Sequence, residues 1–383
     1  MNTQSLRTEW QRCSANSRQA ERFARRLLAA FGVLALAGQS LPAQVTERSE
    51  TTSFSTITLA HPAEDLIRLP STDWVIAGNI IFAAGLHTAG GGLYWINIRT
   101  RQALPVNLHQ VLVGQPDPEF RACPGPPAAD DFSAHGIDFT VPRNGNPSLL
   151  VVNHGGRESI EVFRVSTKGE MPTLRWAGCV VFPSHLILNA VAPMNDGGFV
   201  ATSMLDRNDK DAFNKMVSGD VTGVVYRWKP GSAPFPLKGT EASVDNGIEV
   251  GPDGSIYVAA WGSKEVLRFR RTGQTFARES TPVDFLPDNL RWAPDGSLLV
   301  AGQRRDRTKM GGRCNGGPCP VAWAAARLDP KTMRANTFMS GDGISFSEAT
   351  TALQIGDEIW LGSASDHNIA IFRNPAQLAG TIH

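Results

Sequence analysis

The sequence predicts an all-β fold, a six-bladed β-propeller. The first observation is a repeat: LNAVAPMNDGGFVAT, DNGIEVGPDGSIYVA and DNLRWAPDGSLLVAG begin at Leu188, Asp245 and Asp288. In each stretch an asparagine precedes an Asp-Gly turn and a short apolar run. Self-similarity at a spacing of roughly 40 to 55 residues, with such turns between short strands, indicates a propeller or a related array. The second observation is that the chain after residue 43 shows no convincing amphipathic helix and no low-complexity linker, which favours one closed domain.

Short β-rich runs follow one another along the chain, separated by Gly, Pro, Asn and Asp clusters that form turns. The runs cover residues 74–81, 93–98, 149–152, 160–165, 224–228, 256–260, 266–269, 298–301, 359–361 and 369–372. The expected blades begin near Glu64, His135, Asn189, Asn246, Asn289 and Glu348. The first and last segments are expected to close the ring. An eight-stranded barrel or sandwich is the alternative, but it does not explain the repeated asparagines.

The first 43 residues differ from the rest of the chain. A basic stretch ending in Arg26 precedes an apolar run at 27–37, and a short polar segment then reaches Ala43. This order is typical of a secretory signal. An uncleaved membrane anchor is the alternative, although the apolar run is shorter than the about 20 residues that span a bilayer. The sequence therefore predicts a signal peptide at 1–43, a single propeller at 44–383, and export to the periplasm or beyond.

Charge and cysteine content narrow the class of protein. A net charge of +1 and a pI near 7.7 give no electrostatic argument for nucleic acid or a strongly acidic partner. Beyond the signal, four cysteines form an even set in a compartment that permits disulfides. Cys314 and Cys319 can close a tight loop, which suggests pairing 314 with 319 and Cys123 with Cys179. Zinc is the alternative for such a pair, but no His or second Cys pair stands nearby.

Oxygen-bearing side chains stand at equivalent positions of the repeat and at the start of the first blade. They are Glu64, Asp65, Asn189, Asn246, Asp288 and Asn289. Because blades surround a central channel, equivalent side chains are expected to converge there. Calcium takes six to eight oxygen ligands, whereas zinc and copper prefer nitrogen and sulfur. The sequence thus predicts a central calcium site; the alternative is that each residue only caps a turn.

Two histidines flank the expected inner hairpin of the second blade. His135 lies in Ala-His-Gly-Ile, and His154 ends Val-Val-Asn-His. An imidazole titrates near neutral pH, so one ring can accept a proton from water while a second relays it. Either histidine could instead be structural.

These motifs, taken in order, resemble a known family. Glu64-Asp65 precedes Leu-Ile-Arg-Leu-Pro, and His135-Gly136-Ile137, Leu-Val-Val-Asn-His154, Leu188-Asn189, Asp245-Asn246-Gly247-Ile248 and Asp288-Asn289-Leu290 follow. The sequence is similar to the paraoxonase and arylesterase branch of the calcium-dependent six-bladed propellers, whose superfamily includes the gluconolactonases.

The resemblance implies roles for particular residues. The catalytic calcium would be held by Glu64, Asn189, Asn246, Asp288 and Asn289, with His135 and His154 as the dyad. A second, structural calcium would use Asp65 and the backbone carbonyl of Ile137, but its third ligand in paraoxonases, an Asp, is Ala190 here. Where paraoxonases place an acidic residue that supports the dyad, at the strand end after Phe199-Val200, this chain reads Ala-Thr-Ser-Met204.

The resemblance implies calcium-dependent hydrolysis of a small lactone or aryl ester. Water would be activated by the His135–His154 dyad, or by Asp288 from within the calcium sphere. The basic stretch 304–320 is a candidate lid that would favour an anionic substrate, or else a solvated loop. A non-enzymatic propeller that uses calcium for rigidity and binds a ligand or partner protein is the second interpretation. A carbon–nitrogen bond-forming enzyme like strictosidine synthase is a third, which the calcium set argues against.

Overall fold

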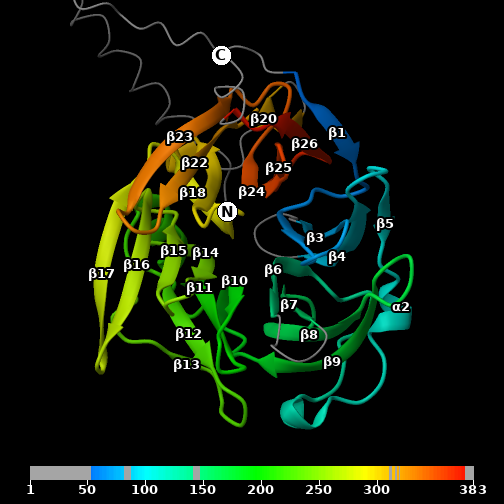
Figure 1. The fold of residues 1–383 in the computed structure, drawn as a ribbon. Coiled ribbons are helices and arrows are strands. Elements are labelled where there is room, and N and C mark those ends of the chain that lie inside the picture. Colours follow the sequence, from blue (N-terminus) through cyan, green and yellow to red (C-terminus); the bar gives the residue numbers. More distant parts are fainter. Residues whose placement is uncertain are drawn as a thin grey trace, which may run out of the picture. The chain divides into compact units, whose positions relative to one another are not determined.

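The computed structural model describes residues 53–81, 88–140, 147–309, 313–314, 317–318 and 320–375. These residues form six four-stranded antiparallel sheets, which follow one another around a common centre (Figure 1). The predicted all-β, six-bladed propeller is therefore confirmed. The expected signal peptide at 1–43 lies outside the described residues.

Each of the first five blades is one continuous stretch of chain. Blade 1 consists of β2 (Asp65–Arg68), β3 (Trp74–Ile81), β4 (Thr88–Asn97) and β5 (Ala103–Pro105). Blade 2 consists of β6 (Ala134–Thr140), β7 (Ser148–Asn153), β8 (Ser159–Ser166) and β9 (Thr173–Val181). Blade 3 consists of β10 (Leu186–Pro193), β11 (Phe199–Asp206), β12 (Val224–Trp228) and β13 (Phe235–Pro236). Blade 4 consists of β14 (Asp245–Val250), β15 (Ile256–Ala260), β16 (Glu265–Thr272) and β17 (Thr275–Pro282). Blade 5 consists of β18 (Leu286–Trp292), β19 (Leu298–Arg304), β22 (Ala322–Asp329) and β23 (Arg334–Gly341).

The sixth blade combines both ends of the domain. It consists of β24 (Ala349–Ile355), β25 (Glu358–Ser363), β26 (Asn368–Arg373) and β1 (Ser55–Thr58). Strand β1 pairs antiparallel with β26, from Ser55 opposite Ile371 to Thr58 opposite Asn368. The expected closure of the ring by the first and last segments is confirmed, and because β1 leads into β2, it joins blade 6 to blade 1.

The remaining regular elements are short connections. They are α2 (Leu108–Val111), α3 (Ala212–Ser218), the 3-10 turns η1 (Pro118–Phe120) and η2 (Arg307–Lys309), and the hairpin β20 (Arg313–Cys314) with β21 (Gly317–Pro318). Among the described residues, no helix has the length and apolar character needed to cross a membrane.

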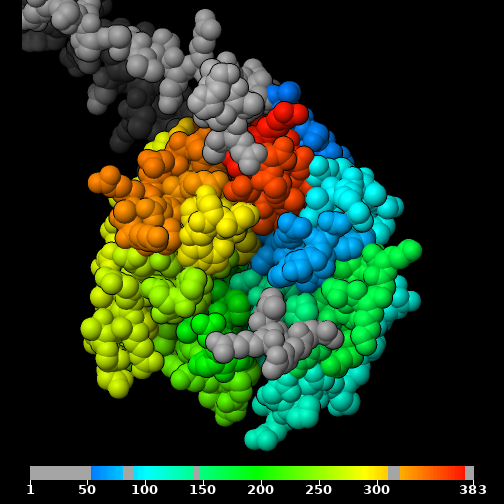
Figure 2. Space-filling model, viewed as in Figure 1, coloured from blue at the N-terminus to red at the C-terminus, as the bar shows by residue number. Residues whose placement is uncertain are grey.

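The apolar core lies between neighbouring sheets. The largest cluster spans blades 1 to 3 and contains the fully buried rings of Phe132, Phe163 and Trp176. Phe132 and Phe163 meet edge to face, with their ring centroids 6.3 Å apart. Figure 2 shows the sheets packed against one another in chain order around the ring. The innermost strands are thereby held at fixed positions around the central axis.

A disulfide joins Cys123, in the connection between blades 1 and 2, to Cys179 on β9. This pairing was expected. The other expected pair includes Cys319, which lies outside the described residues.

Removing this disulfide by the double substitution Cys123→Ser, Cys179→Ser is expected to lower the free energy of unfolding by about 2–4 kcal/mol. The physical reason is that the bond closes a loop across a sequence separation of 56 residues and restricts the unfolded chain. Urea denaturation of the oxidised wild type and the variant measures the difference. Equal midpoints and slopes would contradict the expectation.

Candidate active site

The innermost strands carry the residues that the sequence singled out. His135 is on β6, Asn189 on β10, Asn246 on β14, and Asp288 and Asn289 on β18. Glu64 directly precedes β2. These blades therefore contribute their site residues at comparable positions along their innermost strands.

A break in strand pairing surrounds each of the inner-strand site residues. The register shifts between Ala134 and Ile137, between Leu188 and Val191, between Asp245 and Ile248, and between Pro287 and Leu290. These four irregularities enclose His135, Asn189, Asn246 and the Asp288-Asn289 pair. Bulges are common beside active sites because they re-aim a side chain that regular pairing would direct elsewhere.

Two glycines allow the inner strands to approach one another at the site. A Cβ on Gly136 would lie 2.5 Å from the backbone oxygen of Asn189, and a Cβ on Gly247 would lie 2.4 Å from that of Asp288. Both distances are far below a van der Waals contact. The Gly that follows His135 and the Gly that follows Asn246 are therefore required for close packing of neighbouring blades.

The structure brings the five expected ligands together. Asn289 donates a hydrogen bond from Nδ2 to Oε1 of Glu64 at 2.7 Å. The side chain of Asn246 acts to lower the pKa of Asp288, and the charge of Asp288 acts on Glu64. Nε2 of His135 lies 3.8 Å from Oε2 of Glu64 and 3.5 Å from Nδ2 of Asn189. All are at most 6% exposed.

Four of these side chains have an oxygen with no hydrogen-bond partner although the atom is buried. The atoms are Oε2 of Glu64, Oδ1 of Asn189, Oδ1 of Asn246 and Oδ1 of Asp288. A buried polar atom without a partner is costly. Four such oxygens from blades 1, 3, 4 and 5 fit a hard cation that prefers oxygen ligands. No three Asp, Glu, His or Cys side chains gather as a metal cluster within the described residues, and the expected set depends on its asparagines.

The acidic groups of the site repel one another. Burial raises the pKa of Glu64 well above its usual value, and the charges of Asp288 and Asp65 raise it further. Burial likewise raises the pKa of Asp288 to about 7. A cation bound between these carboxyl groups would favour their charged forms and offset the repulsion.

Asp288 is held in place by Gln303. Nε2 of Gln303 donates to Oδ2 of Asp288 at 2.6 Å, and Oε1 of Gln303 accepts from Nε1 of Trp261 at 2.9 Å. All three groups are buried. The unpartnered Oδ1 of Asp288 is therefore kept in a defined position.

The two histidines form a hydrogen-bonded chain that ends on a carboxylate. Nδ1 of His135 lies 2.9 Å from Nε2 of His154, and Nδ1 of His154 lies 2.9 Å from Oε1 of Glu158. With Glu158 ionised, Nδ1 of His154 is the donor, its Nε2 accepts from His135, and the lone pair of His135 Nε2 faces Glu64 and Asn189. The arrangement therefore directs a basic nitrogen towards the candidate metal site.

Glu158 was missed in the sequence. It lies in the turn between β7 and β8, four residues after His154, is 3% exposed, and accepts the backbone N–H of Leu188 at 2.7 Å. The resemblance places this acid at the end of β11. There, Sδ of Met204 instead accepts a hydrogen bond from Nδ2 of Asn189. The available signal was the His-x-x-x-Glu spacing across a tight turn between two strands.

The ligands expected for a second ion have another partner. Asp65 and the carbonyl of Ile137 both accept hydrogen bonds from Nη2 of Arg291, the second at 2.6 Å. Ala190, at the third position, offers no side-chain oxygen. The expected second calcium therefore does not fit these residues.

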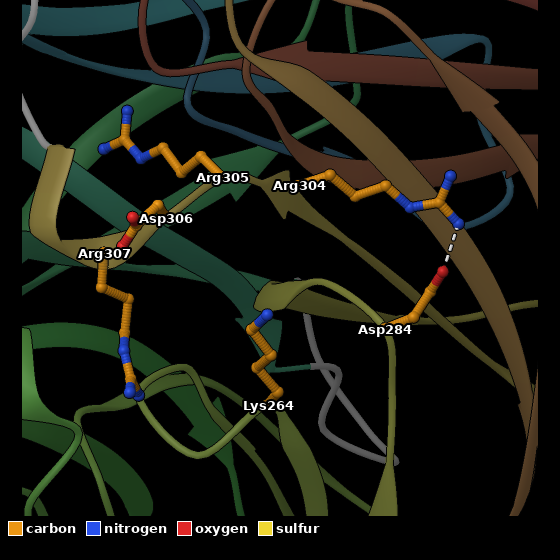
Figure 3. Close-up of a pocket in the computed structure, with 6 residues that line it drawn as sticks. All are labelled: Lys264, Asp284, Arg304, Arg305, Asp306 and Arg307. Atoms are coloured by element: carbon orange, nitrogen blue, oxygen red, sulfur yellow. Dashed lines mark hydrogen bonds and ion pairs between the residues drawn. The ribbon is translucent and has the colours of Figure 1, made fainter. Parts of the chain in front are cut away.

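A basic pocket of about 650 Å³ lies beyond Gln303, where β19 ends. Its lining residues are Lys264, Asp284, Arg304, Arg305, Asp306 and Arg307 (Figure 3). Arg304 pairs with Asp284 at 2.5 Å, and Arg305 pairs with Glu348 at 2.9 Å. Arg304 directly follows Gln303, which holds Asp288, so the chain connects the pocket to the candidate site. Four cationic side chains against two acidic ones give it a positive character.

Comparisons with known proteins bear on the fold alone. No family model matches the chain, and no curated protein matches it. A luciferin-regenerating enzyme superposes with a TM-score of 0.50 and 12% identity, over 84% of this chain and 94% of that chain. A protein described as a candidate gluconolactonase gives 0.49 and 13%, over 85% and 93%. The calcium-binding protein regucalcin from Agrobacterium tumefaciens strain C58 gives 0.47 and 13%, over 87% and 91%. At 12% identity the superposition on the luciferin-regenerating enzyme supports the fold alone, and the six sheets make the chain a six-bladed β-propeller.

Proposed function

We propose that this protein is a calcium-dependent hydrolase of lactones or aryl esters, a carboxylic ester hydrolase. The observation that supports it best is the position of four unpartnered, buried oxygens beside the Glu158–His154–His135 chain. An oxygen-lined cation site next to a directed imidazole suits attack of water on a carbonyl carbon.

Glu64, Asn189, Asn246, Asp288 and Asn289 would hold the ion. The chemistry that a bound calcium ion supplies here is polarisation of the substrate carbonyl and stabilisation of the negative charge that develops on its oxygen. Asn289 and Gln303 keep Glu64 and Asp288 oriented through the hydrogen bonds described above.

In the proposed reaction, Nε2 of His135 accepts a proton from water while the water oxygen bonds to the carbonyl carbon. His154 accepts a hydrogen bond from His135 and donates one to Glu158, so the positive charge on His135 is stabilised. The carbon–oxygen bond to the leaving alkoxide then breaks, and His135 returns the proton to that alkoxide. The products are a carboxylic acid and an alcohol, or one hydroxy acid from a lactone.

Substrate preference would be influenced by the basic pocket. A carboxylate or phosphate on a small substrate would be attracted by Lys264 and the neighbouring arginines, while Asp284 and Glu348 already occupy two of those arginines. The net charge of +1 gives no electrostatic argument for nucleic acid as the substrate.

Export is part of the same proposal. The Cys123–Cys179 disulfide suits an oxidising compartment such as the periplasm. The basic and apolar order of residues 1–43 supports a signal peptide.

The proposal is tested by assaying a panel of lactones, phenyl esters and phosphotriesters with calcium and with a chelator. Hydrolysis of at least one lactone or ester is expected with calcium, and its loss is expected with the chelator while circular dichroism still reports a folded protein. Inactivity towards the whole panel in the presence of calcium would refute the hydrolase and favour the second interpretation, a propeller that binds a ligand or a partner protein.

A further inference from the structure

Arg291 is a buried arginine two residues after the candidate ligand Asn289. Its side chain is only 5% exposed. Nε donates to the carbonyl of Leu66 at 2.9 Å, and Nη1 donates to Oε1 of Glu249 at 3.2 Å. Nη2 donates to Asp65 and to the carbonyl of Ile137. One guanidinium on blade 5 thus contacts inner strands of blades 1, 2 and 4.

The charge around Arg291 is otherwise negative. Asp65, Asp138 and Glu249 are all at most 6% exposed, and each acts electrostatically on the guanidinium. Burial lowers the pKa of Arg291, but these three acids outweigh burial and keep it above its usual value. A buried carboxylate needs a compensating charge, and the cluster contains one permanent cation.

This guanidinium uses the oxygens that a second metal ion would need. Asp65 Oδ2 and the Ile137 carbonyl cannot both accept hydrogen bonds from Arg291 and coordinate a cation in the same place. The planar guanidinium has five N–H donors and can bind several oxygens at once. A metal ion would bind the same oxygens by coordination.

The residues that Arg291 contacts are neighbours in the chain of candidate active-site residues. Asp65 follows Glu64 and also accepts the N–H of Ile137 at 3.0 Å. Ile137 stands two residues after His135, and Arg291 stands two residues after Asn289. The cluster therefore links the strand segments that carry a candidate ligand, the candidate base and a second candidate ligand.

We propose that Arg291 is a built-in cation that replaces a second metal ion and positions the inner strands of the candidate active site. The protein accordingly takes up calcium only at the Glu64–Asn289 site, and its blades are joined without a structural ion. This inference concerns the cluster around Arg291 and is tested by calcium stoichiometry and Tm. It can therefore fail or stand independently of the proposed hydrolysis.

The test compares calcium uptake by the wild type and by Arg291→Ala, using equilibrium dialysis and elemental analysis without substrate. The wild type is expected to bind one calcium per chain. The variant leaves Asp65, Asp138 and Glu249 without a cation, so it is expected to bind one calcium more than the wild type. Its Tm in chelator is expected to fall by about 5–10 °C and to recover partly with calcium.

Arg227→Ala is the matched control. Arg227 is 5% exposed, pairs with Asp196 and donates to the carbonyls of Phe199 and Trp228, away from the candidate site. It is expected to lose stability without any change in calcium stoichiometry.

Two calcium ions in the wild type, or a folded Arg291→Ala variant with no additional calcium, would overturn the inference. If Arg291→Ala does not fold, Arg291→Lys tests the inference instead, because lysine keeps the positive charge and lacks the planar set of donors of the guanidinium. The inference then expects the wild-type stoichiometry with a lower Tm, and an unchanged Tm would refute it. A wild type that binds calcium but hydrolyses nothing would refute only the proposed function.

Discussion

Glu64→Gln is expected to lower kcat/KM for ester or lactone hydrolysis by about 10²–10³-fold, the effect of losing electrostatic stabilisation of a developing oxyanion. Glutamine has nearly the same shape, and its carbonyl oxygen can still accept from Nδ2 of Asn289. What it removes is one of the two formal negative charges that Glu64 and Asp288 would offer to the cation. Calcium affinity is therefore expected to fall together with activity, while the fold is retained.

The measurements are calcium binding by titration calorimetry and hydrolysis over a range of calcium concentrations. Glu265→Gln is the matched control, since Glu265 lies on β16 and faces Arg278 at 3.8 Å, outside the candidate site. It should leave both quantities at the wild-type level. Wild-type calcium affinity in Glu64→Gln would mean that the ion is held elsewhere, even if activity is lost.

The architecture could be predicted because inner and middle strands are constrained on both faces. The apolar run at 256–260 became the fully buried β15, and the Asn-headed repeats became the inner strands β10, β14 and β18. The predicted runs include none of the outermost strands, which are β1, β5, β9, β13, β17 and β23, and they also miss β22, the third strand of blade 5. Strand β17 reads TFARESTP and is mostly exposed, so no apolar pattern distinguishes it from a loop. Its pairing with β16 depends on backbone hydrogen bonds and register, which the sequence does not display.

The candidate site was predictable to the extent that its residues recur at equivalent positions of the repeat. Asn189, Asn246 and Asp288 share a position on successive inner strands, so the ring itself brings them together, and Asn289 follows one residue later. Glu158 lies outside the repeats, and Arg291 lies in one repeat at a position where the other two have Ala192 and Glu249, so neither residue type recurs. Their importance depends on contacts across a turn and across the axis, to His154 in one case and Asp65 in the other. Such contacts become visible only when the blades are placed around the ring.

His135→Gln is expected to reduce kcat by about 10²–10⁴-fold, the range for losing a general base. It distinguishes the two candidate bases, because Asp288 keeps its hydrogen bond from Gln303 in this variant. Calcium affinity is expected to stay close to that of the wild type, since His135 is not among the proposed ligands. Near-normal turnover in His135→Gln would instead assign proton removal to Asp288.

Glu158→Gln tests whether the histidine chain acts as a unit. The amide cannot supply the negative charge that stabilises a protonated dyad, so kcat is expected to fall by about 10- to 10³-fold, less than or equal to the effect of His135→Gln. The acid limb of the pH profile of kcat/KM is expected to move to lower pH, because a base without its carboxylate partner loses its proton more readily. A merely structural role for Glu158 would reduce activity without moving that limb. Additive losses of kcat in the double variant Glu158→Gln, His135→Gln would also contradict the chain. Once His135 is removed, Glu158 has no relay to support, so its further removal should cost little.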